Sequence, residues 1–198
     1  IGNTLQKESY DLTSVTGIGF PSDEFTKIAS SATQYGTSRS TTSALVSFFG
    51  KGTYIFADKY ILDASIRADG SSRFGKENKW AYFPSIGGAW RISQESFLAD
   101  IQWLSDLKLK ASYGITGNQN GINDFASRGL WSGGHNYLNA SGIFPSQLAN
   151  PNLKWETTSQ FNAGFEIGFI KNKFNIDFNY YDKYTKDLLL SNPISSKL

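Results

Sequence analysis

The sequence predicts an all-β protein, a fragment of an antiparallel transmembrane β-barrel. Three observations lead to this prediction: apolar and polar residues alternate, the alternating segments are long, and tight turns alternate with long loops. Successive side chains of a strand point to opposite faces, so alternation gives a sheet one apolar and one polar face. The 198-residue chain is 15% aromatic and lacks cysteine, which excludes intrinsic disorder, a disulfide scaffold and a thiolate metal site.

Six segments alternate with period two, and the last two of them form a predicted hairpin around a short turn at residues 170–173. We therefore expect about six strands of roughly 10–16 residues, longer than the usual 5–6 residues and long enough to cross a bilayer. The segments lie around residues 44–56, 62–69, 82–91, 107–116, 161–169 and 174–184.

The two C-terminal segments show the alternation most clearly, because aromatic and aliphatic residues alternate there with asparagine, glycine and acidic residues. In a membrane barrel the apolar set faces lipid and the polar set faces the lumen. The residues that we expect to face lipid are Phe161, Phe165, Ile167, Phe174, Ile176 and Phe178.

The connections are of two kinds, which supports the membrane interpretation. The turns at 57–59 and 170–173 are tight, whereas the loops at 69–79 and 117–154 are long. Short periplasmic turns and long extracellular loops are typical of outer-membrane barrels. The link from Ile92 to Asp106 departs from this rule, and its apolar spacing predicts a short amphipathic helix.

These connections divide the chain into three expected parts. We predict an extracellular loop region over residues 1–42, with a helical turn near 22–32, because alternation there is weak. Residues 43–190 are expected to form the barrel strands with their turns and loops, and residues 191–198 to begin the next extracellular loop. A soluble extracellular β-sandwich, serving as a binding or adhesion module, is the alternative, because sandwich strands alternate as well.

Several runs of sequence resemble the SusC/RagA-type TonB-dependent outer-membrane transporters. The most specific run is YIFADKYILDASIRADGSSRFGKENKWAYFPSIGGAWRISQESF, at residues 54–97. The runs LSDLKLKASYGITGNQ, NPNLKWETTSQFNAGFEIGF and FNIDFNYYDKYTKDLLL follow it in the family's order. The match covers about residues 43–190, so the resemblance extends well beyond a single motif.

This resemblance implies a 22-stranded barrel with an N-terminal plug, in the outer membrane of a Gram-negative, Bacteroidetes-like cell. It further implies import of large nutrients, glycans or peptides, powered by TonB, with a SusD-like surface lipoprotein as a lid. Because plug and TonB-interacting segment are missing from this sequence, we expect it to be an internal fragment of about six strands. Its expected partners are therefore the lipoprotein, TonB, outer-membrane lipid and the substrate.

No catalytic or metal-binding constellation accompanies these features, so we expect neither an enzyme nor a cofactor. His135 is the only histidine, and no cysteine stands beside it as a metal ligand. The net charge of +2 also gives no indication of a nucleic-acid partner. In the loop after residue 117, aromatic and amide side chains could contact a substrate or a lid, or could simply pack the loop. These candidates are Trp131, Tyr137, Phe144, Asn118 and Asn120.

Overall fold

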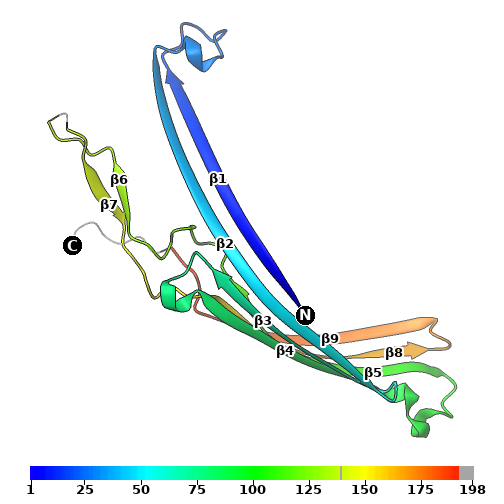
Figure 1. Ribbon diagram of the computed structural model, residues 1–198. Coiled ribbons are helices and arrows are strands. Elements are labelled where there is room, and N and C mark those ends of the chain that lie inside the picture. Colours follow the sequence, from blue (N-terminus) through cyan, green and yellow to red (C-terminus); the bar gives the residue numbers. More distant parts are fainter. Residues whose placement is uncertain (139, 192–198) are drawn as a thin grey trace.

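The computed structural model describes residues 1–138 and 140–191, and most of their strands form one curved antiparallel sheet (Figure 1). The sheet has seven strands in the order β1-β2-β3-β4-β5-β8-β9, and a separate two-stranded sheet, β6-β7, interrupts the connection from β5 to β8. The strands are β1 Gly2–Ile18, β2 Thr33–Phe56, β3 Tyr60–Ser71, β4 Trp80–Arg91, β5 Leu104–Asn118, β6 Leu130–Gly133, β7 Ile143–Gln147, β8 Glu156–Phe169 and β9 Phe174–Lys186.

The prediction of long antiparallel strands is confirmed, and the sandwich alternative is not supported. A sandwich requires two sheets that cover each other's apolar faces. Within the described ranges, the only sheet besides the seven-stranded one is the small β6-β7 hairpin. Large apolar side chains such as Phe48, Ile86 and Phe178 consequently remain exposed. Among the described residues, no helix is both long and apolar enough to cross a membrane.

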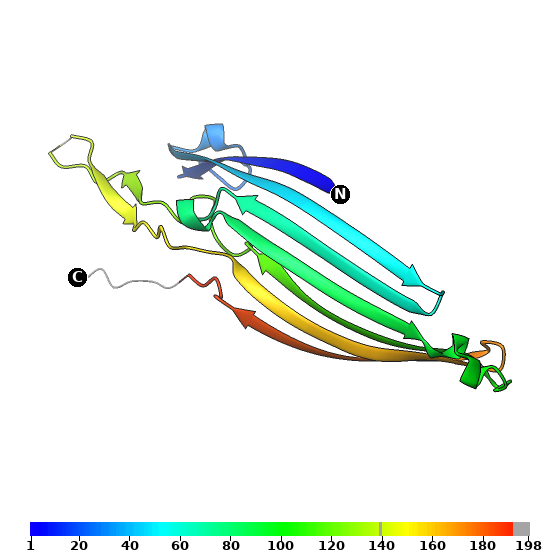
Figure 2. The same ribbon diagram turned by 60° about the horizontal axis from the view of Figure 1, so that its bottom comes forward.

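Tight turns and long loops lie at opposite ends of the sheet, as the sequence predicts (Figure 2). The turn between β2 and β3 places Ala57 and Asp58 at φ 51° and 56°. Positive φ at both central residues is typical of a type I′ turn, whose backbone twist matches the twist of the two flanking strands. The turn between β8 and β9 uses three consecutive residues with positive φ, from Ile170 to Asn172.

The prediction of a loop over residues 1–42 is wrong in its secondary structure. β1 and β2 pair without interruption from Gly2↔Phe49 to Ile18↔Thr33. β3 begins to pair with β2 only at Leu45, so the upper half of this hairpin extends beyond the rest of the sheet (Figure 1). Its residues are exposed on both faces, and no buried or lipid-facing side therefore imposes alternation on the sequence.

Two smaller expectations also change. The helical turn near 22–32 is present only as the 3-10 helix η1, Ile28–Ser30. The sheet has seven long strands instead of about six, because the N-terminal strand carries no alternation signal. The remaining 3-10 turn on the long-loop side is η2, Lys76–Asn78. Of residues 191–198, expected to begin a further loop, residues 192–198 lie outside the described residues.

The link between β4 and β5 is not the predicted amphipathic helix but two single 3-10 turns, η3 Ile92–Gln94 and η4 Ser96–Leu98. Glu95 separates them with an extended backbone, at φ −81° and ψ 145°. Its carboxylate accepts hydrogen bonds from the Lys59 ammonium at 2.8 Å, the Tyr60 hydroxyl at 2.9 Å and the Trp90 indole N–H at 3.1 Å. These donors, Lys59 foremost, lower the pKa of Glu95 to about 2, so it stays charged while tying the link to β3 and β4.

A small aromatic core lies at the long-loop end, beyond the point where β4 stops pairing with β5 at Ser85↔Gly114. It consists of Phe74, Phe83 and Trp155, which are almost fully buried. The Trp155 ring lies 4.7 Å from that of Phe74 and 5.6 Å from that of Phe83, and its indole N–H donates to the Lys79 carbonyl. This cluster fastens the loop after β3 to the segment that enters β8.

We predict that Trp155→Ala lowers the free energy of unfolding by about 3–5 kcal/mol, the usual cost of removing a buried large aromatic side chain. Trp155 is 6% exposed, whereas Trp131 is 65% exposed, so Trp131→Ala is the matched control and should change stability little. Denaturant unfolding of the purified folded protein, followed by far-ultraviolet circular dichroism, measures both. Equal losses for the two variants would contradict the assignment of Trp155 as the centre of this core.

Candidate functional site

The strand register separates the side chains of the sheet into two faces. We call the apolar face the outer face and the polar face the inner face. On the outer face, Leu109, Phe165 and Phe178 are consecutive cross-strand partners, and the last two rings stack 5.4 Å apart. Ile167↔Ile176 and Phe169↔Phe174 continue this apolar surface. The six residues predicted to face lipid therefore do share one face: Phe161, Phe165, Ile167, Phe174, Ile176 and Phe178.

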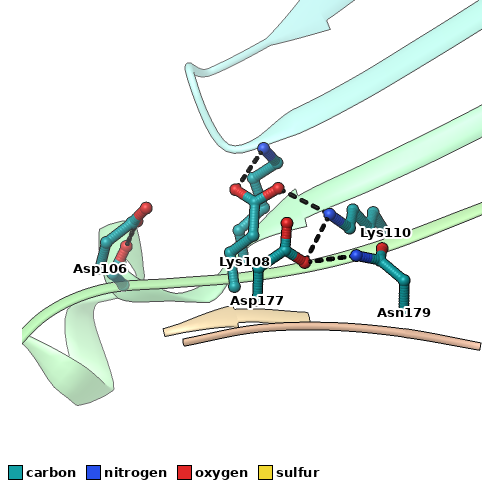
Figure 3. A network of polar contacts seen from close by, with 7 residues as sticks. Asp106, Lys108, Lys110, Asp177 and Asn179 are labelled. Atoms are coloured by element: carbon teal, nitrogen blue, oxygen red, sulfur yellow. Dashed lines mark hydrogen bonds and ion pairs between the residues drawn. The ribbon is translucent and has the colours of Figure 1, made fainter. Parts of the chain in front are cut away.

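The inner face carries a network of charges that spans β5, β8 and β9 (Figure 3). Lys108 and Lys110 each donate from Nζ to the Glu166 carboxylate at 2.8 Å. Lys110 also reaches Asp177 Oδ1 at 2.9 Å, and Asn179 donates to the same oxygen at 2.7 Å. We call Lys108, Lys110, Glu166 and Asp177 the four-charge cluster; its two positive and two negative charges cancel.

The four-charge cluster depends on a glycine in the strand between its partners. Lys110, Gly164 and Asn179 are cross-strand neighbours on β5, β8 and β9. A Cβ at position 164 would lie 3.2 Å from Lys110 Cε, 2.7 Å from Asn179 Oδ1, and too close to the Phe178 carbonyl. The bare backbone of Gly164 thus lets the Lys110 side chain cross β8 to reach Asp177. A glycine in a strand interior commonly marks such a close approach.

Two smaller clusters on the inner face are neutral as well. Arg67 donates to Asp69 at 2.7 Å and to the Ser47 hydroxyl at 2.9 Å. Asp63 accepts from Thr53 at 2.5 Å and pairs with Lys51 at 3.4 Å. Half-exposed ion pairs contribute little to stability. Their consequence is electrostatic. Most charges on the inner face are balanced by close partners, so this face exerts little long-range attraction on ions.

At the long-loop end, a hydrogen-bonded centre joins three segments that are far apart in the sequence. Arg73, in the loop after β3, donates from Nε to Asp124 at 2.9 Å. The Thr41 hydroxyl, and then Arg73, hold the pKa of the Asp124 carboxyl below its usual value. This centre connects β2 to the loops that follow β3 and β5. Nothing in the sequence pattern indicates it, because loop residues 51 positions apart have no periodic relation.

The predicted loop candidates are only partly brought together. Trp131, Tyr137 and Phe144 belong to the β6-β7 hairpin, where Trp131 opposes Pro145 and the next pair is Ser132↔Phe144. Neighbouring positions on a strand point to opposite faces, so Trp131 and Phe144 do not form one stacking platform. Phe144 instead contacts the His135 ring edge-on, with centroids 4.0 Å apart.

The two amide candidates lie elsewhere, at the end of β5. Asn118 donates from Nδ2 to Glu156 Oε1 at 3.0 Å and accepts from the Asn120 backbone N–H at 2.9 Å. These bonds fix the start of the long loop against β8. Among the described residues, no group of three or more His, Asp or Glu residues is placed to hold a metal ion.

Comparison with known proteins points to one family. Residues 2–197 match the family model described as "TonB dependent receptor-like, beta-barrel". TonB-dependent receptor P39 of Formosa agariphila is 38% identical over 197 residues, which cover 98% of this chain and 19% of the relative. TonB-dependent receptor SusC of Bacteroides thetaiotaomicron is 39% identical over 161 residues, covering 78% of this chain and 16% of that protein.

Solved structures agree with the sequence relatives. The structure of the RagAB peptide transporter superposes with a TM-score of 0.83 at 33% identity, covering 98% of this chain and 22% of that chain. The RagAB peptide importer in its open-open state gives a TM-score of 0.81 at the same identity and coverage. The chain therefore spans about a fifth of the length of the proteins that it matches.

We predict that Gly164→Val destabilises the sheet by about 1–3 kcal/mol, the usual cost of overpacking, because the new side chain displaces Lys110 and strains β8 against β9. Gly52→Val is the matched control: a Cβ at this position on β2 would have no atom within 4 Å, and a β-branched residue suits a strand. Denaturant midpoints of the two purified variants provide the comparison. A destabilisation of the control that equals that of Gly164→Val would refute the crossing of Lys110 as the cause.

Proposed function

The chain belongs to the TonB-dependent receptors, in their SusC/RagA group, and we propose that it forms part of the barrel wall of a transporter that imports large nutrients. TonB-dependent receptors are proteins of the Gram-negative outer membrane, and their family is one of transporters, not enzymes. The proposal concerns the whole protein, of which a chain of this length supplies only a part of the wall.

One observation carries the proposal: the sheet has an exposed apolar face and a polar face whose charges are mostly paired. A wall between lipid and a water-filled lumen requires both. Phe165 and Phe178 represent the outer face, and the four-charge cluster lies directly behind them on the inner face. The short turns then face the periplasm and the β1-β2 and β6-β7 hairpins project outside the cell.

For the substrate, peptides are the first candidate and glycans the second. The superposed RagAB structures are of a peptide transporter, and they match almost the whole of this chain at 33% identity. A SusD-like lipoprotein is the proposed lid, and TonB the proposed source of energy, acting through parts of the protein outside this chain. The exposed rings of Trp131 and Tyr137 support a role of the β6-β7 hairpin in contacting the lid or the substrate.

The lipid-facing assignment predicts opposite accessibilities at neighbouring positions. In the full-length protein in liposomes, a nitroxide label at Ile176 should collide with oxygen and be shielded from a water-soluble nickel complex. A label at Asn175, the adjacent residue on the inner face, is the matched control and should show the reverse. Phe178→Arg should also destabilise the protein, by an amount that reaches about 2–4 kcal/mol at the bilayer midplane and falls toward the interfaces. Equal nickel accessibility at positions 175 and 176 would remove the support for a membrane wall.

The import function predicts a TonB-dependent uptake. Cells that lack the full-length protein should lose the accumulation of fluorescent oligopeptides too large for general porins, and restoring the gene should recover it. Cells that keep the protein but lack TonB serve as the control and should be equally defective. Loss of oligosaccharide uptake alone would select the glycan alternative, whereas uptake unaffected by the loss of TonB would contradict the proposed function.

A further inference from the structure

The apolar outer face is interrupted by three small residues that stand side by side. Gly88 on β4, Ala111 on β5 and Ala163 on β8 are direct cross-strand partners. Bulky residues close both ends of this row, Leu62 on β3 and Tyr180 on β9. At this level of the outer face, three adjacent strands therefore present no side chain larger than a methyl group.

Large side chains stand one step away along the strands on both sides of the row. Residues of one face are two positions apart, about 7 Å along a strand, and neighbouring strands are about 5 Å apart. The missing row thus leaves a groove about 7 Å wide across three strands. Its walls are Trp90, Leu109 and Phe165 toward the short turns, and Ile86, Tyr113 and Phe161 toward the long loops.

The groove is continuous with a hollow of about 790 Å³. The hollow also reaches Tyr54 and Tyr60 at its β2-β3 end. Its lining includes Leu62, Gly88, Trp90, Leu109, Ala111 and Ala163.

We propose that this groove binds one acyl chain of a phospholipid of the periplasmic leaflet; the inference rests on the proposed function, which places the outer face in lipid. The groove is lined by hydrocarbon side chains and backbone, so its occupant is apolar. An α-helix, about 10–12 Å across, is too wide to enter a groove of one missing row. A single extended hydrocarbon chain fits, and it restores the dispersion contacts that the three small residues leave open.

The position of the groove identifies the leaflet. On its short-turn side, the rings of Phe56, Tyr60 and Trp90 stack in sequence, with centroids 6.3 and 6.1 Å apart. The polar atoms of Tyr60 and Trp90 are fixed by Glu95, and such amphipathic rings lie at the headgroup level. The groove is the next row toward the bilayer centre, where the acyl chains of periplasmic phospholipids begin.

The test uses the full-length transporter in nanodiscs that contain phosphatidylethanolamine with a photoreactive diazirine in its acyl chain. After irradiation, peptide mass spectrometry should find the label on peptides that carry Trp90 and Leu109. Gly88→Leu should reduce this labelling by roughly tenfold, because the leucine would fill the floor of the groove. The fold tolerates it, because a Cβ at position 88 lies 3.7 Å from its nearest neighbour, the Ile61 carbonyl oxygen.

Two further variants make the result decisive. Ala111→Leu fills the same floor from the neighbouring strand and should cause the same loss, so a folding defect in one variant does not decide the outcome. Gly52→Leu, on the outer face of β2 but outside the groove, is the matched control and should label like the unmodified protein.

Three outcomes would overturn the proposal: labelling at Leu109 that the floor variants leave unchanged, crosslinks to a second copy of the protein, or preferential labelling by a diazirine-bearing lipopolysaccharide. The proposed function is judged separately by labelling elsewhere on the outer face. If Phe178 is labelled but the floor variants leave the labelling at Leu109 unchanged, the groove proposal fails and the membrane placement stands. Labelling that is absent from the whole outer face overturns the membrane placement and the groove together.

Discussion

Backbone pairing is the constraint from which the rest of this structure follows. In hydrocarbon every N–H and C=O group must find a partner within the protein, because water is not there to replace it. Long antiparallel strands satisfy this requirement, and from β2 to β9 each strand of the main sheet pairs with its neighbour over seven or more residues. The register of these pairs then decides which side chains of neighbouring strands contact each other.

Register explains how one sheet serves two solvents with few residue types. Lys108, Glu166 and Asp177 form one inner row, while Leu109, Phe165 and Phe178 form the adjacent outer row. A slip of one residue in β8 would exchange the two sets and put the Glu166 carboxylate into lipid. The free-energy cost of that exchange therefore helps to fix the register. Gly164 also favours the observed register, because only this register makes Gly164 the cross-strand partner of Lys110.

The sequence was sufficient to predict the strands that have one apolar face, their hairpin order and the set of large apolar residues that share this face. It was insufficient for β1, whose two faces are both exposed and mix polar with apolar residues, so that its pairing with β2 leaves no periodic pattern in the sequence. The 92–103 link also escaped prediction, because apolar spacing indicated a helix while three donors around Glu95 hold it in an extended conformation. The Phe74–Phe83–Trp155 core and the Arg73–Asp124 contact join distant loops, and such contacts depend on the tertiary fold alone.

The distribution of charge indicates where selectivity in the proposed transporter arises. A wall of uncompensated charge would favour or exclude ions along its whole length. Here the four-charge cluster sums to zero and the Arg67–Asp69 and Lys51–Asp63 pairs are neutral as well. In the proposed transporter, a wall of this kind would solvate the lumen without strongly retaining a charged substrate. The proposal then leaves recognition to the loop end, where the β6-β7 hairpin presents exposed rings and is tied to the preceding loop by hydrogen bonds from the Gln147 amide to the Phe125 and Arg128 carbonyls.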